Sequence, residues 1–452
     1  MLCFAIAVTF LLFTVGEQVA ADESWMRFRG PNGSGASEGE APLPVEWSED
    51  LNLAWKNALP GPGASSPIVV GSRVWVTCYS GYGTPEDTER DIRQLKRHLC
   101  CYDLTSGSLQ WQQAVAATLP EDSYYDSGVS SHGYASHTPV SDGERVYAFF
   151  GKTGVIAFDI WGEKLWSRKV GSGSDPPKWG SSSSPILHRD LLIVTAAAES
   201  QSLFGLHKLT GEVVWKYQSS GLVGMWGTPA IVSIDGGHSV LVMMVAGELW
   251  GFDPANGERL WTQKATESRQ AYASVICDGP RLFAFSGSGG GSLAVRLQQD
   301  LVRSPAPKAL PEVLWRSPIG TTYATPILHQ DKLYSISRNI LTVMDAKSGQ
   351  RLDQIRLKGA KETGGPFGSL DYPSPVIHSR KLYYLNARGQ VYVFDLDSEL
   401  EPIAINELGS EKETFWGSPA IADGKLILRS NRSLYCIEQV RENEVDPAVI
   451  GP

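Results

Sequence analysis

Short segments in which apolar and polar residues alternate recur along the chain between residues 53 and 440. Arg73–Thr77 and Lys332–Ile336 are two examples, and each lies between a shorter apolar segment and a third one that ends at a turn. An alternation with a period of two is typical of a strand with one buried face. The pattern therefore predicts an all-β protein built from many short antiparallel strands.

These segments belong to a sequence repeat. Each copy begins with Ser-Pro or Thr-Pro followed by apolar residues, and one copy has valine in place of proline. Successive starts are 44 to 51 residues apart, apart from one separation of 72, which matches the roughly 40 to 50 residues of a four-stranded propeller blade. We therefore predict an eight-bladed β-propeller of four-stranded antiparallel blades. The starts are Pro67, Pro139, Pro185, Pro229, Val275, Pro326, Pro375 and Pro419.

A second motif follows the third strand of most copies. It consists of Asp-x-x-x-Gly and a tryptophan four residues later, as in Asp103–Gly107 with Trp111. Asp can hydrogen-bond its own backbone and Gly supplies a left-handed conformation, so the spacing specifies a turn. We expect the tryptophan to pack against a neighbouring blade. The fifth copy lacks this turn, the sixth has Asp353 in place of tryptophan, and the seventh also lacks its tryptophan, so docking should be weaker there.

The eighth copy, 417–438, has only three strand segments. Leu53–Lys56 precedes the first copy and looks like the missing fourth strand. We predict that this N-terminal strand completes the last blade, which closes the ring and removes exposed sheet edges.

The expected organisation is a signal peptide at 1–21, a Gly- and Pro-rich arm at 22–52, the propeller at 53–440 and a tail at 441–452. The apolar run 2–15 is shorter than the roughly 20 residues of a membrane-spanning helix. Small residues before position 22 fit a cleavage site. No Lys or Arg precedes the run, which leaves the true start codon open. The sequence predicts export to the periplasm or the outside, with no transmembrane segment in the mature chain.

The net charge of -9 argues against binding to nucleic acid or to an anionic membrane surface. The mature chain has an odd number of cysteines, which does not indicate a disulfide framework. Cys100 and Cys101 are adjacent within an apolar segment. Because alternate side chains of a strand point to opposite faces, we expect two packed thiols rather than a vicinal bridge.

The tryptophan motif resembles the docking motif of the pyrroloquinoline quinone (PQQ) family of β-propellers, as in 102–111, 206–215 and 252–261. The resemblance extends from residue 53 to about 438. The segments 25–35, 132–135 and 178–180 are similar to single-domain PQQ-like propellers of planctomycete-type bacteria. The resemblance implies the fold of quinoprotein alcohol dehydrogenases, whose members hold PQQ and calcium at the axial opening and use an aspartate base.

The residue three positions before the repeat start is aromatic in five successive copies. In a propeller these positions surround the axial opening, so the five side chains would line a shared mouth. Flat apolar faces suit a sugar, a quinone or an anchoring peptide side chain. The alternative is that they pack between blades and face no ligand. The candidates are Trp226, Tyr272, Tyr323, Tyr372 and Trp416, joined by Trp179, Tyr134, Arg269 and Asp371.

Candidate metal ligands are sparse. His132, His137 and Asp126 lie in or beside the segment 120–136, and two histidines with a carboxylate could hold a metal, although their spacing is unspecific. No set of carboxylates for calcium can be assigned, and there is no Cys-x-x-Cys-His motif for haem.

Three functions follow from these observations. The first is an exported, monomeric binding or scaffold module that resembles BamB-type propellers and holds a protein partner, small molecule or glycan at its axial face without catalysis. The second is a PQQ-dependent quinoprotein dehydrogenase, or a relative that binds PQQ with calcium. The third is a carbohydrate-binding propeller.

Overall fold

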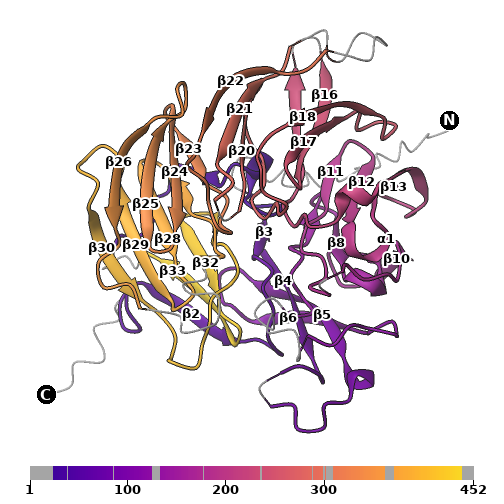
Figure 1. The fold of residues 1–452 in the computed structure, drawn as a ribbon. Coiled ribbons are helices and arrows are strands. Elements are labelled where there is room, and N and C mark those ends of the chain that lie inside the picture. The colour runs from indigo at the N-terminus through magenta and orange to yellow at the C-terminus, as the bar shows by residue number, and fades with distance from the viewer. Residues whose placement is uncertain are drawn as a thin grey trace, which may run out of the picture.

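A computed structural model describes residues 24–37, 39–84, 86–124, 133–176, 178–234, 237–287, 289–298, 301, 309–361 and 371–439. These residues form eight separate sheets that follow one another around a ring (Figure 1). Among the elements of the described residues there is one short α-helical turn, α1 (Ala197–Ser200). The predicted all-β, eight-bladed propeller is confirmed.

The first half of the ring consists of four blades of four antiparallel strands each, in simple up-and-down order. Their strands are β3 (Ile68–Val70), β4 (Arg73–Ser80), β5 (Lys96–Asp103) and β6 (Leu109–Ala116) in blade 1; β7 (Val140–Ser141), β8 (Arg145–Phe149), β9 (Val155–Asp159) and β10 (Lys164–Arg168) in blade 2; β11 (Ile186–His188), β12 (Leu191–Ala196), β13 (Ser202–His207) and β14 (Val213–Gln218) in blade 3; and β15 (Ala230–Ile234), β16 (His238–Val245), β17 (Glu248–Phe252) and β18 (Arg259–Lys264) in blade 4.

The second half repeats this plan with two additions from the N-terminal region. Its strands are β19 (Ile276–Asp278), β20 (Arg281–Phe285), β21 (Ser292–Arg296) and β22 (Glu312–Ser317) in blade 5; β23 (Ile327–His329), β24 (Lys332–Ser337), β25 (Ile340–Asp345) and β26 (Arg351–Arg356) in blade 6; β27 (Val376–His378), β28 (Lys381–Leu385), β29 (Gln390–Asp395), β30 (Pro402–Glu407) and the added β1 (Ala36–Ser37) in blade 7; and β31 (Ala420–Ala422), β32 (Lys425–Arg429), β33 (Ser433–Glu438) and the added β2 (Leu53–Ala58) in blade 8.

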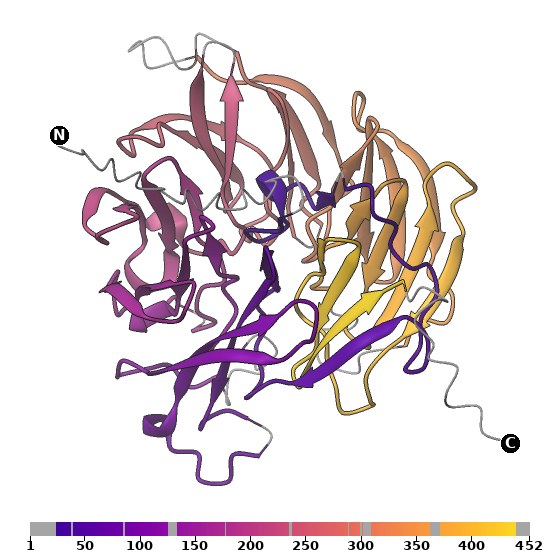
Figure 2. The same ribbon diagram turned by 180° about the vertical axis from the view of Figure 1, so that it is seen from behind.

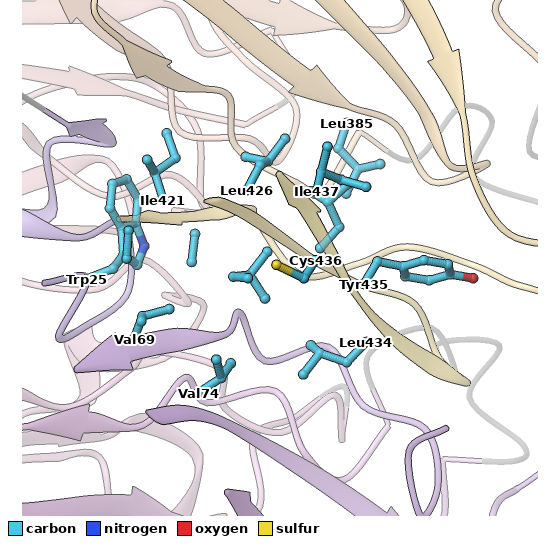
Figure 3. Close-up of a cluster of buried hydrophobic side chains, with 14 of the residues drawn as sticks. Trp25, Val69, Val74, Leu385, Ile421, Leu426, Leu434, Tyr435, Cys436 and Ile437 are labelled. Carbon is cyan, nitrogen blue, oxygen red and sulfur yellow. The ribbon is translucent and has the colours of Figure 1, made fainter. Parts of the chain in front are cut away.

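The N-terminal strand β2 closes the ring as predicted. It pairs antiparallel with β33, with Trp55 opposite Cys436. Side chains of blades 8 and 1 then share one hydrophobic cluster, in which Cys436 and Leu434 lie near Val74 (Figure 3). Strands about 380 residues apart in sequence are therefore joined by both hydrogen bonds and packing.

In blades 1, 2, 3, 5 and 8 the tryptophan of the fourth strand packs on the turn of the next blade. The indole Nε1 of Trp111, for example, donates to the carbonyl oxygen of Ile160 at 3.0 Å. A Cβ on Gly162 would lie 2.8 Å from the Trp111 ring, and its φ is +92°. Glycine is thus needed both for the turn and for the close approach of the indole. Equivalent bonds come from Trp55, Trp166, Trp215 and Trp315.

Trp261 faces blade 5, where the docking turn is missing. Its side chain is 4 % exposed, yet its Nε1 has no hydrogen-bond partner among the described residues. At the tryptophan position, blade 6 has Asp353 opposite Val343, and blade 7 has Ala404 opposite Val393. Weaker docking on this side of the ring stays a prediction that stability measurements can test.

The N-terminal arm is part of the propeller, which the sequence did not indicate. Trp25 pairs with Val69 of blade 1, and β1 pairs in parallel with β27 of blade 7. Figure 2 shows the indigo arm passing across the middle of the ring and then along blade 7 to β2. The arm therefore covers one end of the central axis.

Further along the arm, Trp47 compensates for the missing tryptophan of blade 7. Its ring stacks on Tyr383 at 6.4 Å, and its backbone N–H donates to Oδ1 of Asn406 at 2.9 Å. Nδ2 of Asn406 donates to the carbonyl of Val45 at 2.9 Å. Ala404 packs against the same cluster, so an indole from the arm lies where the blade offers only a methyl group.

Cys100 and Cys101 behave as expected from strand alternation. Both are unpaired and fully buried. Cys100 lies in the cluster that joins blades 8 and 1, whereas Cys101 lies in the cluster between blades 1 and 2. The prediction of two packed thiols is confirmed.

Candidate functional site

A closed ring of hydrogen bonds surrounds the axis at the start of the eight repeats. The residue before each repeat start is Ser or Thr, and its backbone N–H donates to the side-chain hydroxyl of the corresponding residue in the next blade. The eight distances are 2.9 to 3.0 Å. The members of this hydroxyl ring are Ser66, Thr138, Ser184, Thr228, Ser274, Thr325, Ser374 and Ser418.

The last of these bonds runs from the N–H of Ser418 to Oγ of Ser66 and closes the circle. Proline follows the hydroxyl residue in seven of the eight copies, and proline has no N–H to donate. The side-chain hydroxyl thus supplies an acceptor where no ladder bond joins neighbouring blades. This explains the Ser-Pro and Thr-Pro dipeptides as a device that fixes blade spacing at the axis.

An aromatic wall lies next to the hydroxyl ring. Neighbouring ring centroids along it are 4.4 to 5.8 Å apart, the range in which aromatic pairs attract one another. Trp226 and Tyr272 are stacked, with an interplanar angle of 17°. The aromatic wall consists, in order, of Trp179, Trp226, Tyr272, Tyr323, Tyr372 and Trp416.

Together these residues line an axial cavity of about 430 Å³. The hydroxyl ring and the aromatic wall provide most of the lining, and Phe28 of the arm contributes as well. On blades 1 to 3 the aromatic position is occupied by Ala64, Ser136 and Ser182, so the wall is a crescent whose remaining side carries small side chains. Among the described residues, none that lines the cavity carries a charge.

Six of the nine predicted mouth residues line this cavity, and three do not. Arg269 is exposed, and the neighbouring Gln270 lines the cavity instead. Asp371 is 2 % exposed and accepts a hydrogen bond from Tyr384 at 2.8 Å, which places it behind the wall. Tyr134 packs against Tyr124 in a separate cluster. The six aromatic side chains both pack on one another and face the cavity, and their contact with a ligand stays a prediction.

A small polar chamber of about 20 Å³ adjoins the axial cavity, because Ser136 lines both. In it, Ser181 donates to Oε1 of Glu199 at 2.6 Å. Nε2 of His137 lies 3.1 Å from Oγ of the same serine. Glu199 is 5 % exposed, and its Oε2 has no partner among the described residues.

Burial raises the pKa of Glu199 from 4.5 to about 7, against the hydrogen bond from Ser181, which lowers it. Two nearby ion pairs do not involve Glu199: Arg97 pairs with Glu121 at 2.5 Å, and Lys152 pairs with Asp122 at 2.8 Å. Glu199 is not among the residues predicted from the sequence. Its only signal is an acidic residue directly after the apolar run 191–198 of blade 3.

Of the three predicted metal ligands, only His137 lies among the described residues. His132 and Asp126 lie outside the described residues. His137 is described, and it contacts Ser181 and the ring of Phe149. In the described ranges, no group of three or more His, Cys, Asp or Glu side chains is arranged to hold a metal ion.

The described residues do not fit a calcium-bound PQQ at the axis. Calcium takes six to eight oxygen ligands, normally including several carboxylates, whereas the described lining contains none. Cys100 and Cys101 are buried inside blade 1 and do not reach the cavity. Binding of PQQ stays an alternative that titration with PQQ and calcium can test.

The fold is shared with proteins of different function. BamB from Moraxella catarrhalis superposes with a TM-score of 0.58 at 15% identity, over 85% of this chain and 97% of that one. A europium-containing methanol dehydrogenase gives 0.61 at 12%, over 90% and 89%. The quinohemoprotein alcohol dehydrogenase from Comamonas testosteroni gives 0.58 at 11%, over 94% and 82%. At these identities the similarity shows the fold alone.

A search of curated protein sequences finds no match. Over the described residues, no helix is long and apolar enough to cross a membrane. A family model described as outer membrane protein assembly factor BamB matches residues 36–170 and 96–355. Together these matches cover more than half of the chain and include six of the eight repeat starts. The chain therefore belongs to this family of PQQ-like repeat propellers.

Proposed function

We propose that this protein is an exported binding module that holds a flat or ring-shaped group of its ligand or partner in the axial cavity, without catalysing a reaction. The observation that carries the proposal is the aromatic wall, which faces a cavity of about 430 Å³. Cavities of roughly 300 to 1,000 Å³ with apolar walls and a few polar groups are typical ligand sites.

The lining divides into two kinds of surface. The aromatic wall offers flat faces that attract aromatic rings, sugar rings and cations. The hydroxyl ring offers polar groups that can orient the ligand. The described lining residues include no carboxylate, histidine, cysteine, lysine or arginine, which favours ligand binding over acid–base catalysis in this cavity.

Export is part of the same proposal. It is supported by the apolar N-terminal run and by the family, whose model is described as outer membrane protein assembly factor BamB. A scaffold role is supported in the same way, with a partner's side chain as the occupant of the cavity.

Calorimetric titration with 2-naphthamide, a neutral flat probe, tests the cavity. We expect saturable binding that the double variant Trp226→Ala/Trp416→Ala weakens at least tenfold. Trp161, which is 70% exposed on the outer side of blade 2, provides the control variant Trp161→Ala with unchanged affinity. If the wild-type protein binds neither 2-naphthamide, nor maltotriose, nor N-acetyltryptophanamide, the cavity is a packing feature and the proposal is wrong.

Two alternatives are tested alongside. Saturable uptake of PQQ with calcium, followed by dye reduction with an alcohol, would replace the proposal with a quinoprotein dehydrogenase. Binding of maltotriose but not of 2-naphthamide would instead favour the carbohydrate-binding propeller, because sugar rings stack on aromatic faces and hydrogen-bond to hydroxyl groups.

A further inference from the structure

Two cysteines lie next to each other where blade 8 meets blade 1. Cys78 of β4 and Cys100 of β5 are fully buried in the hydrophobic cluster that joins these blades. Along the two strands, Val76 lies opposite Cys100 and His98 opposite Cys78, so the two sulfurs are diagonal neighbours on one face of the blade. A hydrogen bond joins their side chains.

Arg429 of β32 brings a positive charge to this pair. Its side chain is 0 % exposed, and its Nη2 donates to Sγ of Cys78 at 3.8 Å. Its Nη1 donates to the carbonyl oxygens of Ser65 and Thr77 at 3.2 and 2.9 Å. A guanidinium group of blade 8 is therefore fixed against blade 1, with one edge on the sulfur of Cys78.

The charge of Arg429 is not balanced by a carboxylate. Within the described part of the chain, no carboxylate oxygen lies within 4.0 Å of its guanidinium group, whereas Arg97, which is also buried, pairs with Glu121. A buried cation without a counter-charge is strongly destabilising. Of the described groups that accept a hydrogen bond from Arg429, only the side chain of Cys78 can ionise.

The two sulfurs differ in how readily they ionise. Burial disfavours the thiolate of Cys78, but the hydrogen bond from Cys100 and the charge of Arg429 outweigh it, so the pKa of Cys78 lies below that of an ordinary thiol. The hydrogen bond to Cys78 and burial together raise the pKa of Cys100 well above its usual range. The shared proton therefore stays on Cys100.

Two other cysteines show what burial does without this contact. Cys101 and Cys436 are also 0 % exposed, and Cys436 lies in the same cluster as the pair (Figure 3). Neither accepts a hydrogen bond from an arginine among the described residues, and burial raises the pKa of both to about 12. They are matched internal references for Cys78.

The connection from β2 to β3 covers Cys78 and the arginine. The backbone N–H of Tyr79 donates to the carbonyl oxygen of Pro62 at 2.9 Å, and a Cβ on Gly63 would lie 3.0 Å from Nη1 of Arg429. Pro62 is itself partly exposed. Local opening of this connection gives a small neutral molecule a short path to the sulfur.

We propose that Cys78 is a reactive thiolate, paired with Arg429, which hydroperoxides oxidise at the closure of the ring. Its sulfur attacks one peroxide oxygen, so an S–O bond forms and the O–O bond breaks. The thiolate is oxidised to a sulfenic acid, and hydrogen peroxide is reduced to hydroxide, which takes a proton from solvent. Thiolates are the nucleophiles in this chemistry, and a neighbouring arginine favours them. The proposal does not depend on what occupies the axial cavity.

Oxidation should also weaken the closure of the ring. A sulfenic acid is neutral, so Arg429 loses its counter-charge at the junction of blades 8 and 1. The denaturant midpoint of the wild type should fall after peroxide treatment, whereas that of Cys78→Ser should not change. An unchanged midpoint for protein oxidised at Cys78 would contradict the role of the thiolate as a counter-charge.

Competition among the cysteines of one folded protein tests the reactivity. The reduced wild type is treated with hydrogen peroxide, quenched with catalase, unfolded and alkylated, and each cysteine is then followed by peptide mass spectrometry. We expect Cys78 to be oxidised at least tenfold faster than Cys101 and Cys436. Equal rates at the three positions, or a Cys78 that stays reduced in excess peroxide, would overturn the proposal.

The ultraviolet absorbance of thiolates measures the ion pair without an oxidant. At pH 8 the folded wild type should exceed Cys78→Ser by the absorbance of one thiolate. The control Cys436→Ser should match the wild type, because burial keeps that thiol protonated. Equal absorbance of the wild type and both variants would show that Cys78 is protonated, and the proposal would be wrong.

Discussion

Glu199 is a buried carboxyl group in the polar chamber beside blade 3, and replacing it with glutamine isolates the free-energy cost of ionising it in the folded state. The side chain is 5 % exposed. One oxygen accepts from Ser181, and the other has no partner among the described residues. Glutamine keeps the shape and the acceptor oxygen but cannot ionise.

The magnitude follows from the shift in pKa. Burial raises the pKa of Glu199 from 4.5 to about 7, and each unit corresponds to about 1.4 kcal/mol. Between these two values the folded state binds the proton more tightly than the unfolded state. The contribution of Glu199 to stability is therefore fully present below pH 4.5 and is lost as the pH rises through 7, by about 3 kcal/mol at most.

Denaturant unfolding followed by tryptophan fluorescence measures this effect, since the chain has 14 tryptophans. The difference in unfolding free energy between Glu199→Gln and wild type should grow in favour of the variant between pH 4.5 and 8. The control Glu258→Gln, on an exposed turn of blade 4, should parallel wild type. Parallel profiles for Glu199→Gln as well would show that the chamber is solvated and that the reasoning is wrong.

Two further predictions concern blade docking, and both use denaturant midpoints at constant pH. Gly162→Ala should lower the free energy of unfolding by about 2 to 4 kcal/mol, because its Cβ would enter the indole ring of Trp111. The control Gly143→Ala has the same φ of +92° but lies in open space, so it should cost about 1 kcal/mol. Equal losses of stability in the two variants would mean that the docked ring can move. Trp215→Phe should lower the free energy of unfolding by about 1 kcal/mol more than Trp261→Phe. Of these two indoles, only that of Trp215 donates a hydrogen bond among the described residues. A larger loss of stability for Trp261→Phe would contradict this reasoning.

Much of the architecture was accessible from the sequence because the repeat carries local information. The Ser-Pro or Thr-Pro starts, the Asp-x-x-x-Gly turns and the spaced tryptophans each encode a conformation within a few residues. The orphan segment at 53–56 could be assigned to blade 8 only because counting showed a missing strand. The same indexing found five aromatic residues of the cavity, since equivalent positions of a repeat lie at equivalent radii.

Only the tertiary structure revealed the contacts between segments that do not occupy equivalent positions of the repeat. The sequence identified 22–52 only as a Gly- and Pro-rich arm, yet this arm crosses the axis, adds β1 to blade 7 and supplies Trp47 to its side. Asp371 and Arg269 are close in sequence to cavity residues but point elsewhere. The burial of Glu199 and the placement of Arg29 behind the hydroxyl ring depend on which blades meet around them. Local sequence patterns determine the blades, because a strand or turn is fixed by neighbouring residues, whereas burial and charge at the axis depend on closure of the whole ring.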